Sequence, residues 1–124
     1  MSQDIISDCL NQIMNAKRAR KKKVVVKRHS KLLIEVLGMM KKNGYLDHKI
    51  NGREAEIEMT EKLNECRTIK PRYNVKTPEI DTYVRRFLPA RDFGIIIVST
   101  NKGLMTHEEA LKKNLGGSLI AHIF

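Results

Sequence analysis

The fold is decided by the stretch Phe93-Gly94-Ile95-Ile96-Ile97-Val98-Ser99-Thr100-Asn101-Lys102-Gly103-Leu104-Met105-Thr106-His107-Glu108-Glu109-Ala110. Its residues 95–98 are an apolar β-branched run of strand length, which predicts a buried strand. Residues 99–103 are polar or glycine and predict a loop. Thr106 is followed three residues later by Glu109, a capping-box pattern, so a helix is expected to begin directly after this threonine.

The predicted loop carries groups that suit folded RNA. Hydroxyls, an amide and an ammonium group can satisfy phosphate oxygens, ribose hydroxyls and base edges. For the loop alone, an ordinary solvated turn is the simplest alternative. The candidate RNA-binding residues of this loop are Ser99, Thr100, Asn101, Lys102 and Gly103.

Composition and charge narrow the class of protein. The chain has 124 residues, a formal net charge of +10 and a pI of about 9.8, which favours an anionic partner, with nucleic acid ahead of a membrane surface or an acidic protein. Three Tyr, three Phe and no Trp argue against a base-stacking platform for single strands. No apolar run reaches membrane-spanning length, and Asp4 and Asp8 stand where a signal peptide needs basic residues. We therefore expect a soluble cytoplasmic protein.

The two cysteines, Cys9 and Cys66, are far apart in the sequence. Neither has a neighbouring cysteine or a histidine at ligand spacing, so the pattern indicates neither a zinc site nor a disulfide framework. Buried free thiols are expected. No metal and no cofactor are predicted.

The N-terminal half reads as helix, strand, helix, strand, strand. Apolar residues from Ile5 to Met14 recur at helical spacing after a possible Ser2 cap, and residues 24–26 are strand-like. Ser30 is expected to cap a second helix that closes near Gly44. Asn51-Gly52 is a hairpin signal that predicts the pairs Leu46 with Ile57 and Lys49 with Glu54, with an acidic outer face at Glu54, Glu56 and Glu58.

A basic block follows the first predicted helix and contains no acidic residue. Such a block repels itself unless a polyanion shares it, although a solvated basic turn or a localisation patch is the plainer alternative. The start of a helix, which is expected at Ser30, also favours the binding of a phosphate. The candidate phosphate-binding residues are Lys17, Arg20, Lys21, Lys22, Ser30 and Lys31.

The C-terminal half is expected to be mostly β with short helices. Residues 66–75 suggest an edge strand or bent segment, and Thr77-Pro78-Glu79 predicts a helix start that Leu88-Pro89 ends. A short helix at 107–113 and a final strand at 119–124 complete the pattern. The fold class is therefore α+β, with an N-terminal domain at 1–63 and a C-terminal domain at 64–124.

These residues resemble the small-subunit ribosomal protein eight family, in its archaeal and eukaryotic branch. The resemblance covers essentially the whole chain, in order. The segments that carry it are Asp4–Ala16, Ser30-Lys31, Ile69–Tyr73, Leu88–Met105, Ala110 and Gly116-Gly117.

The resemblance implies a structural constituent of the small ribosomal subunit that binds the central domain of small-subunit rRNA during assembly, beside neighbouring small-subunit proteins. By this resemblance, the loop at 99–103 would read an irregular RNA helix, and the N-terminal basic residues would clamp a second RNA segment. No enzyme activity, small-molecule substrate or membrane partner is implied.

Two alternatives remain. A basic nucleic-acid-binding regulator, acting on its own messenger RNA or compacting DNA, fits the charge, although the neutral polar loop is more than electrostatics alone requires. An enzyme could use His29 beside Ser30, or His107 beside Glu108 and Glu109. Neither histidine has a third orienting group at motif spacing, and each is explained more simply as a surface histidine or a cap neighbour.

Overall fold

The structure is a computed structural model that describes residues 5–27, 29–69, 74–90 and 93–124. Within these residues, helices and strands mix as the α+β prediction requires, with four helices and eight strands in two sheets. The chain divides into two compact units, Met1–Arg67 and Thr68–Phe124. None of the described helices is long and apolar enough to span a bilayer.

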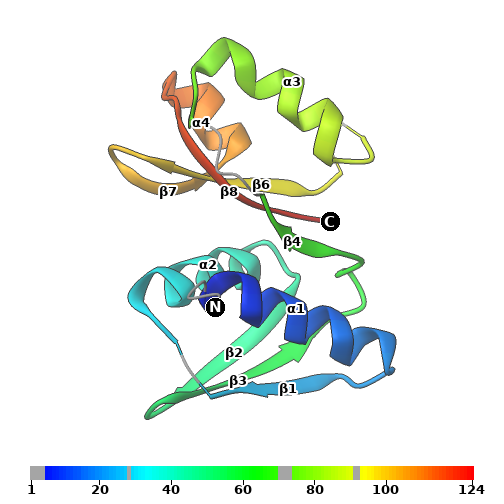
Figure 1. Cartoon of the computed structure of the whole chain (residues 1–124). Coiled ribbons are helices and arrows are strands. Elements are labelled where there is room, and N and C mark those ends of the chain that lie inside the picture. The colour runs from blue at the N-terminus through cyan, green and yellow to red at the C-terminus, as the bar shows by residue number, and fades with distance from the viewer. Residues whose placement is uncertain (1–4, 28, 70–73, 91–92) are drawn as a thin grey trace. The chain divides into compact units, whose positions relative to one another are not determined.

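The first unit is a three-stranded antiparallel sheet with two helices on one face (Figure 1). The strand order is β1-β3-β2, so β3, the last strand of this sheet in the sequence, lies in its centre. The predicted order of elements is confirmed. Their bounds are α1 (Ile5–Arg18), β1 (Lys23–Val26), α2 (Lys31–Lys42), β2 (Leu46–Asn51) and β3 (Glu54–Met59).

Both helices follow from apolar periodicity. α1 buries Ile6, Cys9, Leu10 and Ile13 at helical spacing. The possible cap at Ser2 lies outside the described residues. α2 begins as predicted, because the Ser30 hydroxyl accepts a hydrogen bond from the backbone N–H of Leu33 at 3.2 Å.

The hairpin between β2 and β3 is present, but its predicted register is wrong by two residues. Leu46 pairs with Met59 and Asn51 with Glu54, so the turn is Gly52-Arg53 instead of Asn51-Gly52. Gly52 has φ +60, which suits the first central position of a type II′ turn. A shift of two residues keeps every side chain on its predicted face, so Glu54, Glu56 and Glu58 are still exposed.

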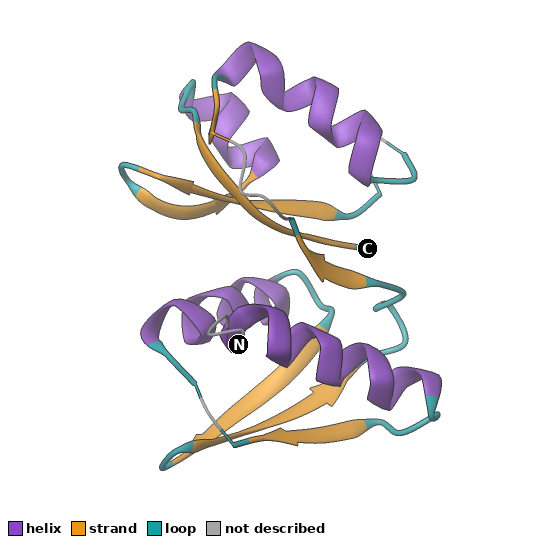
Figure 2. Cartoon of the chain, in the orientation of Figure 1, coloured by secondary structure: helices purple, strands orange, loops and turns teal. Residues whose placement is uncertain are grey.

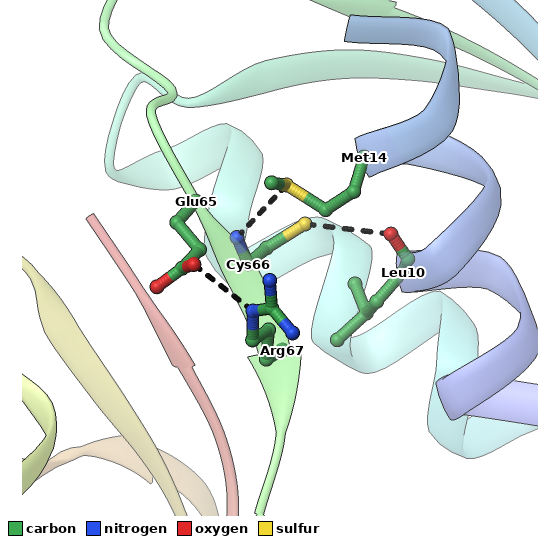
Figure 3. Close-up of polar contacts among 5 residues, drawn as sticks. All are labelled: Leu10, Met14, Glu65, Cys66 and Arg67. Carbon is green, nitrogen blue, oxygen red and sulfur yellow. Dashed lines mark hydrogen bonds and ion pairs between the residues drawn. The ribbon is translucent and has the colours of Figure 1, made fainter. Parts of the chain in front are cut away.

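The chain leaves the first unit through β4 (Cys66–Thr68). Cys66, the first residue of this strand, is hydrogen-bonded to α1. The Cys66 N–H donates to Met14 Sδ at 3.4 Å, and the Cys66 thiol contacts the carbonyl oxygen of Leu10 at 3.8 Å (Figure 3). Cys9 and Cys66 are both buried and free, as predicted. Burial raises the pKa of each thiol to about 12, so neither is a thiolate at neutral pH.

The second sheet has strand order β4-β8-β6-β7, with β5 also paired to β8. α3 and α4 lie on one face of this sheet (Figure 2) and pack on β6 and β8 through a core that includes Ile80, Val84, Ile96, Val98 and Leu119. The bounds are β5 (Asn74–Val75), α3 (Thr77–Phe87), β6 (Ile95–Thr100), β7 (Gly103–Thr106), α4 (His107–Lys113) and β8 (Gly117–Ile123).

The expected sequence of strand, five-residue loop and helix at 95–113 needs a correction. β6 continues through Ser99 and Thr100, and a further strand, β7, begins at Gly103. The predicted loop is therefore the end of a β-hairpin, because cross-strand pairing extends into residues whose local sequence favours a turn. The helix is confirmed, with the Thr106 hydroxyl accepting from the Glu109 N–H at 3.3 Å.

Candidate nucleic-acid interface

The tip of the β6–β7 hairpin is a two-residue turn, Asn101-Lys102, between the paired residues Thr100 and Gly103. The Thr100 hydroxyl donates to the carbonyl oxygen of Gly103 at 2.9 Å and accepts from the Lys102 N–H at 3.1 Å. Gly103 has φ +111, a conformation that side-chain-bearing residues rarely adopt. Thr100 and Gly103 therefore shape the turn, and the Thr100 hydroxyl and the Gly103 carbonyl form hydrogen bonds within it.

The side chains of Asn101 and Lys102 extend from this turn. Both residues are exposed, and neither side chain forms a hydrogen bond or ion pair within the described part of the chain. Ser99, one residue before Thr100, is partly exposed. An amide, an ammonium and a hydroxyl are thus presented by a hairpin whose base, at Ile97 and Val98, is fully buried.

Sequence reasoning missed two polar residues beside Ser99. β8 pairs with both β6 and β5, and this register aligns Ser118 with Ser99 on one side and with Asn74 on the other. The Ser118 hydroxyl donates to the Asn74 side-chain oxygen. Because Val75, Val98 and Leu119 face the helices, the alternation of strands puts Asn74, Ser99 and Ser118 on the opposite face.

Gly117 explains how β8 reaches this position. A Cβ atom at residue 117 would lie 2.1 Å from the carbonyl oxygen of Ser99, far inside contact distance. Only a residue without a side chain allows the two backbones to come so close. The Gly116-Gly117 pair was the available signal in the sequence, since paired glycines before a strand indicate close backbone approach.

The basic residues after α1 are arranged by the way this helix ends. The N–H of Lys21 donates to the carbonyl of Ala16 and that of Arg20 to the carbonyl of Lys17, which is a Schellman motif. Arg20 is the residue in the left-handed conformation, with φ +61, where glycine is usual. The motif stops the helix and directs the chain into β1.

A depression of about 500 Å³ adjoins this turn, and four of the predicted phosphate-binding residues line it. Three of them, Arg20, Lys21 and Lys22, are exposed. The fourth, Lys17, is half-buried and its ammonium donates to the carbonyl oxygen of Leu63, so it is partly used inside the unit. Acidic side chains line the depression as well, namely Asp47, Glu58 and Glu61.

Ser30 and Lys31 are not part of this basic cluster. The His29 ring Nε2 lies 2.8 Å from the carbonyl oxygen of Gly52, which puts the start of α2 near the β2–β3 turn. Lys22, in contrast, accepts a backbone bond from Met59 at the other end of β3. Since β3 is six residues long, the two sets of cations lie on the order of 17 Å apart.

The histidines considered for catalysis have structural contacts. His107 begins α4, as the cap-neighbour interpretation expects, but it is buried, and its Nδ1 accepts the N–H of Ile96 at 3.1 Å. The other two described histidines, His48 and His122, lie in β2 and β8. Within the described ranges, no group of three or more His, Cys, Asp or Glu side chains is arranged to hold a metal ion.

Comparison with known proteins assigns the family. The family model for Ribosomal protein S8 matches residues 4–124. The chain belongs to the ribosomal protein S8 family. This membership accounts for the segments on which the sequence resemblance rests, and confirms that resemblance.

Archaeal and eukaryotic relatives match over nearly the whole chain. Small ribosomal subunit protein uS8 of Archaeoglobus fulgidus is 40% identical, with both chains covered in full. The uS8 protein of Neurospora crassa is 36% identical over 97% of this chain and 96% of its own. Protein uS8A of Schizosaccharomyces pombe is 35% identical over 98% of each chain.

Proposed function

We propose that this S8-family chain is a structural constituent of the small ribosomal subunit, located in the cytoplasm, that binds the central domain of small-subunit rRNA and stabilises it during assembly. Its partners are that RNA and neighbouring small-subunit proteins. The observation that supports the RNA-binding role is the β6–β7 hairpin tip, where the exposed side chains of Asn101 and Lys102 extend from a hairpin with a buried base.

The two units contribute differently in this proposal. Ser99, Asn101 and Lys102, with the turn shaped by Thr100 and Gly103, read base edges and ribose hydroxyls through the shallow minor groove of an RNA helix. Arg20, Lys21 and Lys22 bind phosphates and supply affinity, assisted by Lys17. Ser30 and Lys31 bind phosphate at the separate site where α2 begins. The boundary between the RNA-clamping and RNA-reading halves is placed near residue 63.

RNA crosslinking to the native protein tests the partner. Recovery of small-subunit rRNA from a single locus is the expected result. Recovery of mainly one messenger RNA, or of DNA, would favour the alternative of a basic nucleic-acid-binding regulator.

A pair of variants tests the division of roles. Asn101→Ala is expected to reduce the preference for cognate over generic RNA, because it removes a base-reading group. Lys22→Ala should weaken binding to both RNAs alike, because phosphates carry no sequence information. Affinities for the two RNAs, measured by filter binding at one salt concentration, distinguish these outcomes, and equal losses for both variants would contradict the assignment.

A further inference from the structure

The outer face of the three-stranded sheet, opposite α1 and α2, has a charge that the RNA-binding role does not explain. Glu54, Glu56 and Glu58 project from the central strand β3, and all three are exposed. The chain as a whole carries +10. Three glutamates in one row would repel RNA phosphates, so this face is unsuited to the RNA itself.

Glu54, Glu56 and Glu58 form no ion pair within the described part of the chain. The register sets Lys49 opposite Glu56 and Lys23 opposite Glu58, yet neither pair comes within ion-pair distance. Asp47 also lies opposite Glu58, and its own salt bridge at 3.1 Å is to Lys41 of α2. Among the described residues of the three strands, this face thus carries four carboxylates, those of Glu54, Glu56, Glu58 and Asp47, against the ammonium groups of Lys23 and Lys49, so negative charge is in excess.

The same face is hollowed and partly apolar. A depression of about 390 Å³ is lined by Glu56 and Glu58 of β3 together with residues of β1 and β2. Val25, opposite Glu56 on β1, lines it too and is 47% exposed. Carboxylates beside an exposed aliphatic side chain favour a partner whose cations are carried on alkyl stems, as in lysine and arginine.

We propose that the outer face of the three-stranded sheet binds an extended, lysine- or arginine-rich segment of another protein of the same particle. The inference rests on the proposed place of this chain in the small subunit. Alternate residues of β3 are about 6.8 Å apart, which is also the spacing of alternate residues in an extended peptide. A segment with basic residues at every second position therefore matches the row of glutamates, and the alkyl stems of those basic residues can pack on Val25.

A peptide of alternating lysine and valine is the probe, measured by fluorescence anisotropy against the full chain at low salt. Glu54→Gln/Glu56→Gln is the test variant, because both side chains are exposed and keep their shape, and neither lines the depression beside Arg20, Lys21 and Lys22. Glu35→Gln/Glu108→Gln is the matched control, with the same change in charge at exposed positions of α2 and α4. The test variant should weaken peptide binding about five- to tenfold, and the control variant by less than twofold.

Equal losses of peptide affinity in the two variants would overturn the proposal, because binding would then depend on the net charge of the chain and not on this face. Sedimentation adds a second readout. A dimer that only the test variant loses would identify another copy of this chain as the occupant, and would equally overturn it.

Binding of small-subunit rRNA to the same samples separates this proposal from the proposed function. The test variant should bind the RNA as tightly as the unmodified chain, or more tightly, because two negative charges are gone. A chain that binds the peptide at this face but not the RNA would contradict the proposed function alone. A test variant that loses RNA affinity would show that the face contacts RNA, contrary to the proposal.

Discussion

Arg20 occupies a left-handed backbone conformation in which glycine is usual. Its φ of +61 lies at the αL position of the Schellman motif that ends α1. A residue with a Cβ atom pays about 1 kcal/mol or more there. Glycine would end the helix equally well, so the strained conformation supports the proposal that the Arg20 guanidinium binds phosphate.

Arg20→Gly tests this view. Relief of the backbone strain should leave the free energy of unfolding unchanged or raise it by up to about 1 kcal/mol, while RNA affinity falls. Asn114→Gly is the matched control, because Asn114 also has a positive φ, of +55, at the end of α4 but carries no charge. Urea denaturation measures the stability of both variants, and titration with RNA measures their affinity. A stable Arg20→Gly chain with full RNA affinity would refute a role of Arg20 in RNA binding.

Cys9 and Cys66 make stability depend on pH at the alkaline end. Burial raises the pKa of both thiols from 9.0 to about 12. Below pH 9 the thiols are protonated in both states, and their contribution to stability is complete. Between pH 9 and 12 the unfolded chain ionises them while the folded chain does not, so the free energy of unfolding falls by up to about 1.4 kcal/mol per pH unit and cysteine.

Urea denaturation at several pH values checks this loss, with Cys9→Ala and Cys66→Ala as comparisons. Each variant should lose stability less steeply above pH 9 than the unmodified chain. Parallel profiles for all three proteins would show that other groups are responsible.

Among the elements, those with strong periodicity were predictable and the β6–β7 hairpin was not. Apolar spacing identified α1 and α2, and the β-branched run identified β6. β7 was not predicted because the segment from Ser99 to Gly103 has the composition of a loop. The extended conformation of Ser99, Thr100 and Gly103 is instead set by pairing between β6 and β7. For the same reason, Asn74 and Ser118 could be placed beside Ser99 only by the register of β5 and β8.

Gly117→Ala is the test of how this sheet holds the hairpin. The new methyl group would meet the backbone of Ser99 at 2.1 Å, which no rotamer change can relieve. We expect a loss of about 1–3 kcal/mol in the free energy of unfolding and faster amide exchange in β6 and β8. Gly38→Ala in α2 is the control, because its Cβ meets nothing within 4 Å and should stabilise the helix slightly.

For the molecule as a whole, the sequence specified which cations are present but not how they are distributed. Lys17 looked equivalent to Lys22, yet its ammonium is bonded to the Leu63 carbonyl. Ser30 and Lys31 seemed continuous with the basic block, but folding puts them at the opposite end of β3. This separation depends on tertiary structure, which cannot be predicted from local composition.

This distribution predicts the salt dependence of RNA binding. If five exposed cations each neutralise one phosphate, log K falls against log salt concentration with a slope of about −4.5. These cations are Arg20, Lys21, Lys22, Lys31 and Lys102. Lys21→Gln/Lys22→Gln should make the slope shallower by about 2, whereas Asn101→Ala should weaken cognate binding without changing it. A slope near zero for the unmodified chain, or equal slopes for all three proteins, would show that these lysines do not contact phosphates.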